Sequence, residues 1–128
     1  TGIIVNDEIF WAGGLGPWEG WESFVEIREH SLQGSARACL FQEKFWDHGK
    51  NGAAAINNKI VFFTGIAVST NGYNTRFDIY DVNNYNWSVG QLPVDIGGAS
   101  IFSHNNNVYV VGGMVNGAVS NQIWKLVF

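Results

Sequence analysis

Three indoles and several ionisable side chains gather in two polar stretches of this 128-residue chain. The stretches span residues 15–22 and 45–50, and their candidate binding residues are Trp18, Glu19, Trp21, Glu22, Trp46, Asp47, His48 and Lys50. Planar indoles beside carboxylates suit sugar rings, because the CH groups of a sugar stack on the ring while its hydroxyls bond to acids. We therefore expect a protein- or glycan-binding surface here. The alternative is that these indoles cap a sheet or contact a missing part of the fold.

The carboxylates of Glu19, Glu22 and Asp47 could also form the paired acid and base of a glycosidase. Acidic residues on polar loops are, however, usually only solvated. The chain contains no P-loop, no nucleophile elbow and no dinucleotide fingerprint. We predict no catalytic residue.

Metal and cofactor sites find little support in the sequence. The three histidines, His30, His48 and His104, are widely dispersed, and Cys39 is the single cysteine. One cysteine excludes an internal disulfide and a cysteine-based zinc site. We predict no metal and no cofactor.

The composition indicates one apolar domain of modest size. Hydrophobic residues make up 46% of the chain and charged residues 14%, with a net charge of −4. The seven Lys and Arg residues are scattered, so no basic stripe is available for a nucleic-acid backbone. No apolar run approaches the roughly 20 residues of a membrane helix. Nucleic acid and a membrane span are therefore not expected as partners of this chain.

Three segments of the chain repeat one pattern, at residues 2–14, 52–65 and 98–113. Each has a short apolar strand, a turn containing Asn or Asp, a more aromatic strand and a closing glycine. A third strand follows each glycine, at residues 23–28, 76–81 and 122–128, and a fourth follows twice, at 36–41 and 86–89. The closing glycines lie about 50 residues apart, a spacing typical of four-stranded propeller blades.

In these features the chain resembles the kelch-repeat β-propeller family. The matching residues are the diglycines Gly13-Gly14 and Gly112-Gly113 and the pair Tyr80 and Trp87. The resemblance implies an all-β, kelch-type β-propeller of about three four-stranded antiparallel blades, with repeats at about 1–51, 52–97 and 98–128. It further implies half of a roughly six-bladed ring whose last blade lacks its fourth strand.

Further residues are assigned structural positions by this comparison. Gly65 closes the second repeat, where Thr64 replaces the first glycine of the pair. Tyr80 and Trp87 are large plates that would fill the space between adjacent blades. Ile27 and Trp124 are expected near the position of Tyr80 in the other two repeats.

Several functions are compatible with such a repeat. We expect a protein- or glycan-binding scaffold, completed by another propeller half or a second copy of the chain. One alternative is part of an extracellular carbohydrate-active or copper-radical-oxidase-type enzyme, although Cys39 lies within an expected strand without a Tyr and His cluster. A second alternative is a structural subunit of an assembly. The aromatic- and Asn-rich, Lys-poor strands favour an extracellular or cell-surface location, with the cytoplasm as the alternative.

Overall fold

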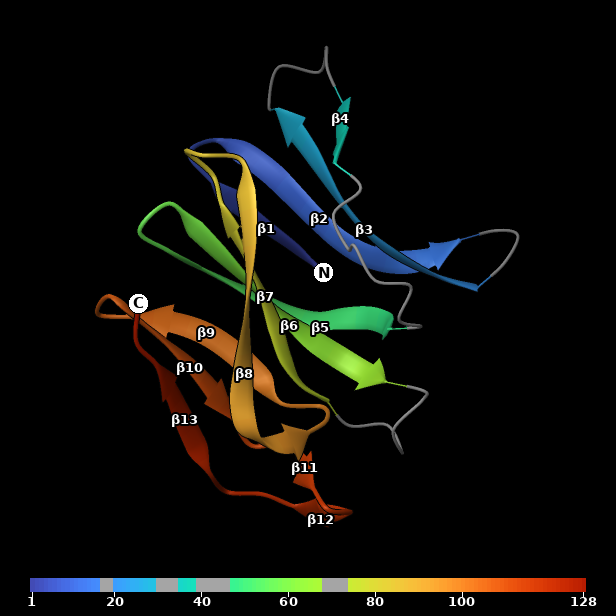
Figure 1. The fold of residues 1–128 in the computed structure, drawn as a ribbon, viewed down its shortest axis with the longest axis vertical. Coiled ribbons are helices and arrows are strands. Elements are labelled where there is room, and N and C mark those ends of the chain that lie inside the picture. The colour runs from blue at the N-terminus through green and yellow to red at the C-terminus, as the bar shows by residue number, and fades with distance from the viewer. Residues whose placement is uncertain (17–19, 30–34, 39–46, 68–73) are drawn as a thin grey trace.

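The computed structural model describes residues 1–16, 20–29, 35–38, 47–67 and 74–128, and the regular structure in them is entirely β (Figure 1). The first sheet has the order β1-β2-β3-β4, with β1 (Gly2–Val5), β2 (Glu8–Gly16), β3 (Gly20–Glu29) and β4 (Ser35–Ala38). The second sheet has the order β5-β6-β7-β8, with β5 (Asp47–Ile56), β6 (Lys59–Ala67), β7 (Asn74–Asp81) and β8 (Asn86–Ile96). The predicted all-β class is confirmed.

The third sheet has the order β13-β10-β9 and contains β9 (Ser100–His104), β10 (Asn107–Val111) and β13 (Ile123–Leu126). A two-stranded ribbon, β11 (Met114–Val115) and β12 (Ala118–Val119), lies between Gly113 and β13. All strand pairs are antiparallel. Within the described residues the sheets form an open stack, and neither a closed barrel nor a closed propeller is present.

Each sheet begins with the same hairpin, whose two-residue turn carries Asn or Asp. We name these the Asn turns: Asn6-Asp7, Asn57-Asn58 and Asn105-Asn106. All six residues have positive φ, between 45° and 63°. Two successive positive φ angles match the right-handed twist of the flanking strands, and Asn and Asp tolerate that conformation better than other non-glycine residues. The predicted turn positions are therefore confirmed, and they fix the register of each hairpin.

The second sheet is buried on both faces. Along β6, Ile60 and Phe62 pack in one cluster with Phe10 of the first sheet, while Val61 and Phe63 pack in another with Val108 and Val110 of the third sheet. All of these side chains are fully buried. A strand covered on both faces needs an unbroken apolar sequence, which the run of residues 60–63 supplies. Burial of each such side chain stabilises the fold by about 1.5–3 kcal/mol.

The fourth strand of the second sheet is longer than the sequence indicated. It was expected to span residues 86–89, but β8 continues to Ile96. Pro93 is tolerated there because β8 is an edge strand, where a missing N–H does not interrupt a ladder. The extension places Leu92 and Ile96 in the core between the second and third sheets.

Candidate functional site

The structure describes five of the eight predicted binding residues, and these five form two groups, one on β3 and one on β5. Trp18, Glu19 and Trp46 lie outside the described residues. Trp21 and Glu22 are among the first residues of β3, where they pair with Leu15 and Gly14 of β2. Asp47, His48 and Lys50 are the other described positions of this set.

Asp47, His48 and Lys50 were expected on a loop, but they open strand β5. Their backbones pair with Ala67, Ile66 and Thr64 of β6, respectively. The ladder shifts register between Lys50 and Gly52, so one extra residue is accommodated there. Sequence reasoning missed this strand because polar side chains and Gly49 are poor strand formers.

Chain direction brings both groups to one end of the stack. β2 ends and β3 begins at the end of the first sheet opposite its Asn turn, and β6 ends and β5 begins at the corresponding end of the second sheet. In Figure 1 these strand ends lie on the right, while the hairpin turns of the three sheets lie on the left. We name the right-hand end the open end. It brings the strand positions of Trp21 and Glu22 to the same end as those of Asp47, His48 and Lys50.

An ion pair with a buried carboxylate lies on β7, toward the open end. Arg76 donates from Nε and Nη2 to Oδ1 of Asp78, at 3.1 and 2.9 Å. The Asp78 side chain is only 2% exposed, and a buried carboxylate needs such a charged partner. Because the two residues are separated by one position on a single strand, the pair needs no distant element to form. Replacing Arg76 by a neutral residue would remove a cationic partner of the buried Asp78 carboxylate.

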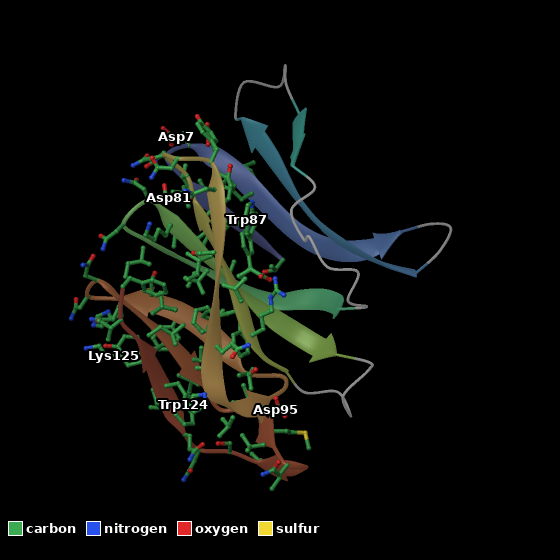
Figure 2. The ribbon with its side chains drawn as sticks, viewed as in Figure 1. Asp7, Asp81, Trp87, Asp95, Trp124 and Lys125 are labelled. Atoms are coloured by element: carbon green, nitrogen blue, oxygen red, sulfur yellow. The ribbon has the colours of Figure 1, made fainter. Side chains whose placement is uncertain are left out.

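An aromatic cluster fills the space between the first and second sheets. The rings of Tyr80 and Trp87 are 4.8 Å apart, Trp87 stacks on Phe62 at 5.9 Å, and Phe10 lies 6.0 Å from Tyr80. Figure 2 labels Trp87 within this part of the stack. Burial is the main cause that raises the pKa of the Tyr80 phenol, with smaller contributions from nearby Tyr85, Glu8 and Asp81. The neutral phenol is therefore favoured, as suits a packing residue.

The register identifies the residues that hold the Tyr80 position in the other two sheets. Tyr80 pairs with Ile60, which is two residues beyond the Asn turn of its sheet. The corresponding residue in the third sheet, Val108, pairs with Leu126, so Leu126 and not Trp124 has the Tyr80 position.

In the first sheet the same position belongs to Arg28, which pairs with Ile9. Ile27 and Trp124, which were expected near this position, lie one and two residues before it, respectively. Trp124 instead packs against the core between the second and third sheets, and its buried Nε1 has no hydrogen-bond partner among the described residues.

The glycines assigned structural roles occupy different environments. Gly112 and Gly113 have φ of 70° and 85°, and a Cβ on Gly113 would lie 2.7 Å from the carbonyl oxygen of Gly97. The absence of a side chain lets Met114 and Gly97 exchange backbone hydrogen bonds of 2.8 and 3.1 Å. Gly13 and Gly14 lie within β2 beside a register shift, and Gly65 lies within β6.

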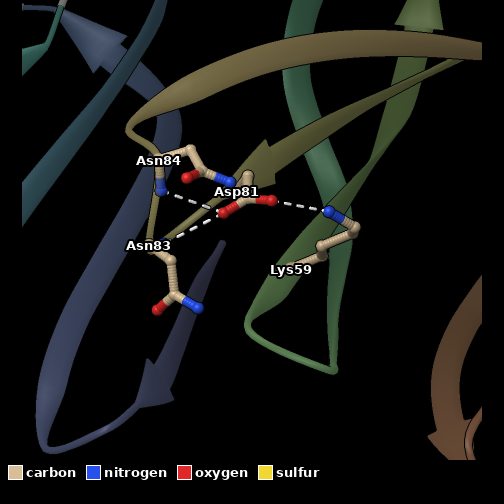
Figure 3. A network of polar contacts seen from close by, with 4 residues as sticks. All are labelled: Lys59, Asp81, Asn83 and Asn84. Atoms are coloured by element: carbon tan, nitrogen blue, oxygen red, sulfur yellow. Dashed lines mark hydrogen bonds and ion pairs between the residues drawn. The ribbon is translucent and has the colours of Figure 1, made fainter.

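A second polar network, at the turn end of the second sheet, was not anticipated. Asp81 accepts a bond of 2.6 Å from Nζ of Lys59, and its other oxygen accepts the backbone N–H groups of Asn83 and Asn84, both at 3.0 Å (Figure 3). The bond from Lys59, followed by that from Asn84, lowers the pKa of Asp81 to about 2. The run Asp81-Val-Asn-Asn was the available signal, since Asp commonly accepts N–H bonds two and three residues ahead. This network closes the β7–β8 turn.

The part of the chain that the structure describes contains no group of three or more His, Cys, Asp or Glu residues arranged to hold a metal ion. The described residues also include no helix with the length and apolarity needed to cross a membrane.

Comparison with known proteins adds no assignment. No protein-family model matches the chain, and no curated protein matches it.

Proposed function

We propose that this chain is a kelch-type propeller half that binds a protein or a glycan at the open end. The observation that carries the proposal is the convergence of two strand starts, those of β3 and β5, at that end. These strand starts carry Trp21 and Glu22 in one case and Asp47, His48 and Lys50 in the other. Residues of these types at one end of the stack would offer an indole on which a sugar ring or an aromatic side chain stacks, and carboxylates that accept hydrogen bonds from hydroxyls or amides.

The repeat architecture supports the kelch-type part of the proposal. Three successive antiparallel sheets each open with the same tight hairpin, and they stack face to face in chain order. In this arrangement the Asn turns occupy one end of the stack, and the starts of β3 and β5 lie at the other. Binding residues in folded proteins concentrate at one end of a rigid scaffold, where its strands are connected. Another propeller half or a second copy of the chain would complete the ring.

A glycan titration tests the proposed function directly. The intrinsic tryptophan fluorescence of the chain is followed while a cello-oligosaccharide and, separately, a chito-oligosaccharide are added. We expect saturable binding that the double substitution Trp18→Ala and Trp21→Ala abolishes without lowering the melting temperature. Trp87→Phe is the matched control, because Trp87 lies between sheets and its loss should lower stability while leaving sugar affinity unchanged.

Two results would contradict the binding site. One is an equal loss of affinity and of stability in the double variant, which would assign the two indoles to the fold. The other is an absence of saturable binding by the unmodified chain to either sugar and to an immobilised peptide library.

A further inference from the structure

The two interfaces between sheets repeat one arrangement. Counted from the Asn turns, Phe10, Val61 and Tyr109 hold the same position in their sheets, and Ile9, Ile60 and Val108 hold the position before it. Phe10 packs toward the second sheet and Val61 toward the third. We name the face of each sheet that carries Phe10, Val61 or Tyr109 its forward face, and the opposite face its backward face. The forward face of each sheet therefore packs on the backward face of the next.

The third sheet has a forward face that no other described sheet covers. Tyr109 on this face pairs with Phe102 and Lys125, and Val111 pairs with Ile123. The rings of Phe102 and Tyr109 stack at 5.6 Å, yet Phe102 is 47% exposed and Ile123 65% exposed. Figure 2 shows Lys125 on the outer side of β13, and strand alternation puts Trp124 on the other side.

The second sheet shows what these positions do when they are covered. The residues in register with Phe102, Tyr109, Val111 and Ile123 are Ala54, Val61, Phe63 and Phe77, and all four are at most 6% exposed. Gly52 lies on the same face, and a Cβ there would approach Cγ2 of Ile101 in the third sheet to 2.5 Å. The exposed forward face of the third sheet thus resembles in its apolar residues the forward face of the second sheet, which is buried against the third.

The first sheet has a complementary open face. Ile4 pairs with Ile9 across β1 and β2, on the side away from Ile3 and Phe10. Ile4 is 67% exposed. Ile9 is only partly buried, whereas its counterparts Ile60 and Val108 are fully buried against the preceding sheet.

We propose that a second copy of this chain occupies these faces, with the forward face of the third sheet of one copy on the backward face of the first sheet of the other. A second copy is inferred because both interfaces within the chain join a forward face to a backward face. The second copy would supply a backward face for the third sheet and a forward face for the first sheet. The contact is heterologous, and two copies complete both contacts if the stack closes. Lys125 fits such a contact by laying its aliphatic stem on the partner with the ammonium at the edge. The inference rests on the repeat architecture proposed above, but its test measures association and not ligand binding.

Sedimentation velocity over a range of chain concentrations tests the proposal. The unmodified chain should reach twice its mass of 14.1 kDa. Ile123→Lys on the third sheet and Ile4→Lys on the first should each weaken association about tenfold or more, because either would bury an unpaired ammonium. Val119→Lys is the matched control, since Val119 is 87% exposed on the β11–β12 ribbon, and it should leave the dimer unchanged. Circular dichroism melts of all variants report whether each is folded.

A mixture of the two variants distinguishes this contact from a symmetric one. The third sheet of Ile4→Lys and the first sheet of Ile123→Lys are both intact, so the mixture should form a dimer that neither variant forms as readily alone. A chain that stays monomeric at every concentration overturns the proposal and leaves the faces to a further repeat or another partner. Dimerisation that only one variant weakens, without recovery in the mixture, also overturns it. Association without sugar binding would count against the proposed function alone.

Discussion

Gly90 lies directly under an aromatic ring, and its replacement by alanine gives a sharp test of the packing in the second sheet. Gly90 of β8 pairs with Phe77 of β7. A Cβ built on Gly90 would overlap Cζ and Cε2 of the Phe77 ring and would lie 2.9 Å from Cε1. Phe77 is itself only 6% exposed and belongs to the core between the second and third sheets.

Two opposing effects set the size of the change in stability. Alanine is favoured over glycine in an extended strand by about 0.5–1 kcal/mol, because it loses less backbone entropy on folding. Overpacking a filled core costs about 1–3 kcal/mol. If the Phe77 ring moved into water instead, the fold would lose a similar amount of free energy from burial of that ring. The overlap is the larger effect, so Gly90→Ala should lower the free energy of unfolding by about 1–2 kcal/mol. For a chain of this length the melting temperature should fall by about 3–8 °C.

Equilibrium unfolding in urea, followed by tryptophan fluorescence, measures this change. The same substitution is made in a Phe77→Leu background, where no ring atoms remain above Gly90. There Gly90→Ala should be neutral or slightly stabilising, which gives a coupling energy of about 1–2 kcal/mol between the two sites. Two results would refute the assignment of the Phe77 ring to this position. One is an equal effect of Gly90→Ala in both backgrounds, and the other is a Gly90→Ala variant as stable as the unmodified chain.

Two further substitutions test the turn end of the stack. Asn58→Ala should lower the free energy of unfolding by about 1 kcal/mol, because Asn58 has a φ of 57° that alanine adopts at a cost. Asn58→Gly should keep the stability of the parent, because glycine adopts positive φ readily, and thermal melts of both variants measure the difference. Asp81→Asn should be less stable than the parent near neutral pH, and the difference should shrink as the pH falls. The folded-state pKa of Asp81 is depressed from 3.8 to about 2, so its contribution is present above pH 4 and is lost as the pH falls toward 2. Urea midpoints of both chains across this range measure the difference, and a difference independent of pH would contradict the role of the ionised carboxylate.

Local sequence patterns were sufficient for the hairpins. Asn and Asp in pairs between apolar segments predict tight turns because few other residues tolerate positive φ, and the Asn turns lie where expected. The chemistry of the open end was also readable as a set of residue types. That the β5 segment of this set is paired backbone and not loop was not readable, because the pairing partner lies in β6.

Strand register and the stacking of the sheets follow from contacts between distant parts of the chain. An all-β chain of repeated hairpins could be predicted from the residues alone, because turn preferences and apolar alternation act within a few residues. Leu126 and Arg28 share the register of Tyr80, and the sequence alone does not fix this register, because it depends on how each strand pairs with its neighbour. The sequence alone also left open which faces are buried: the apolar residues of β6 and those around Phe102 look alike in sequence, and only the position of a neighbouring sheet makes one set a core and leaves the other exposed.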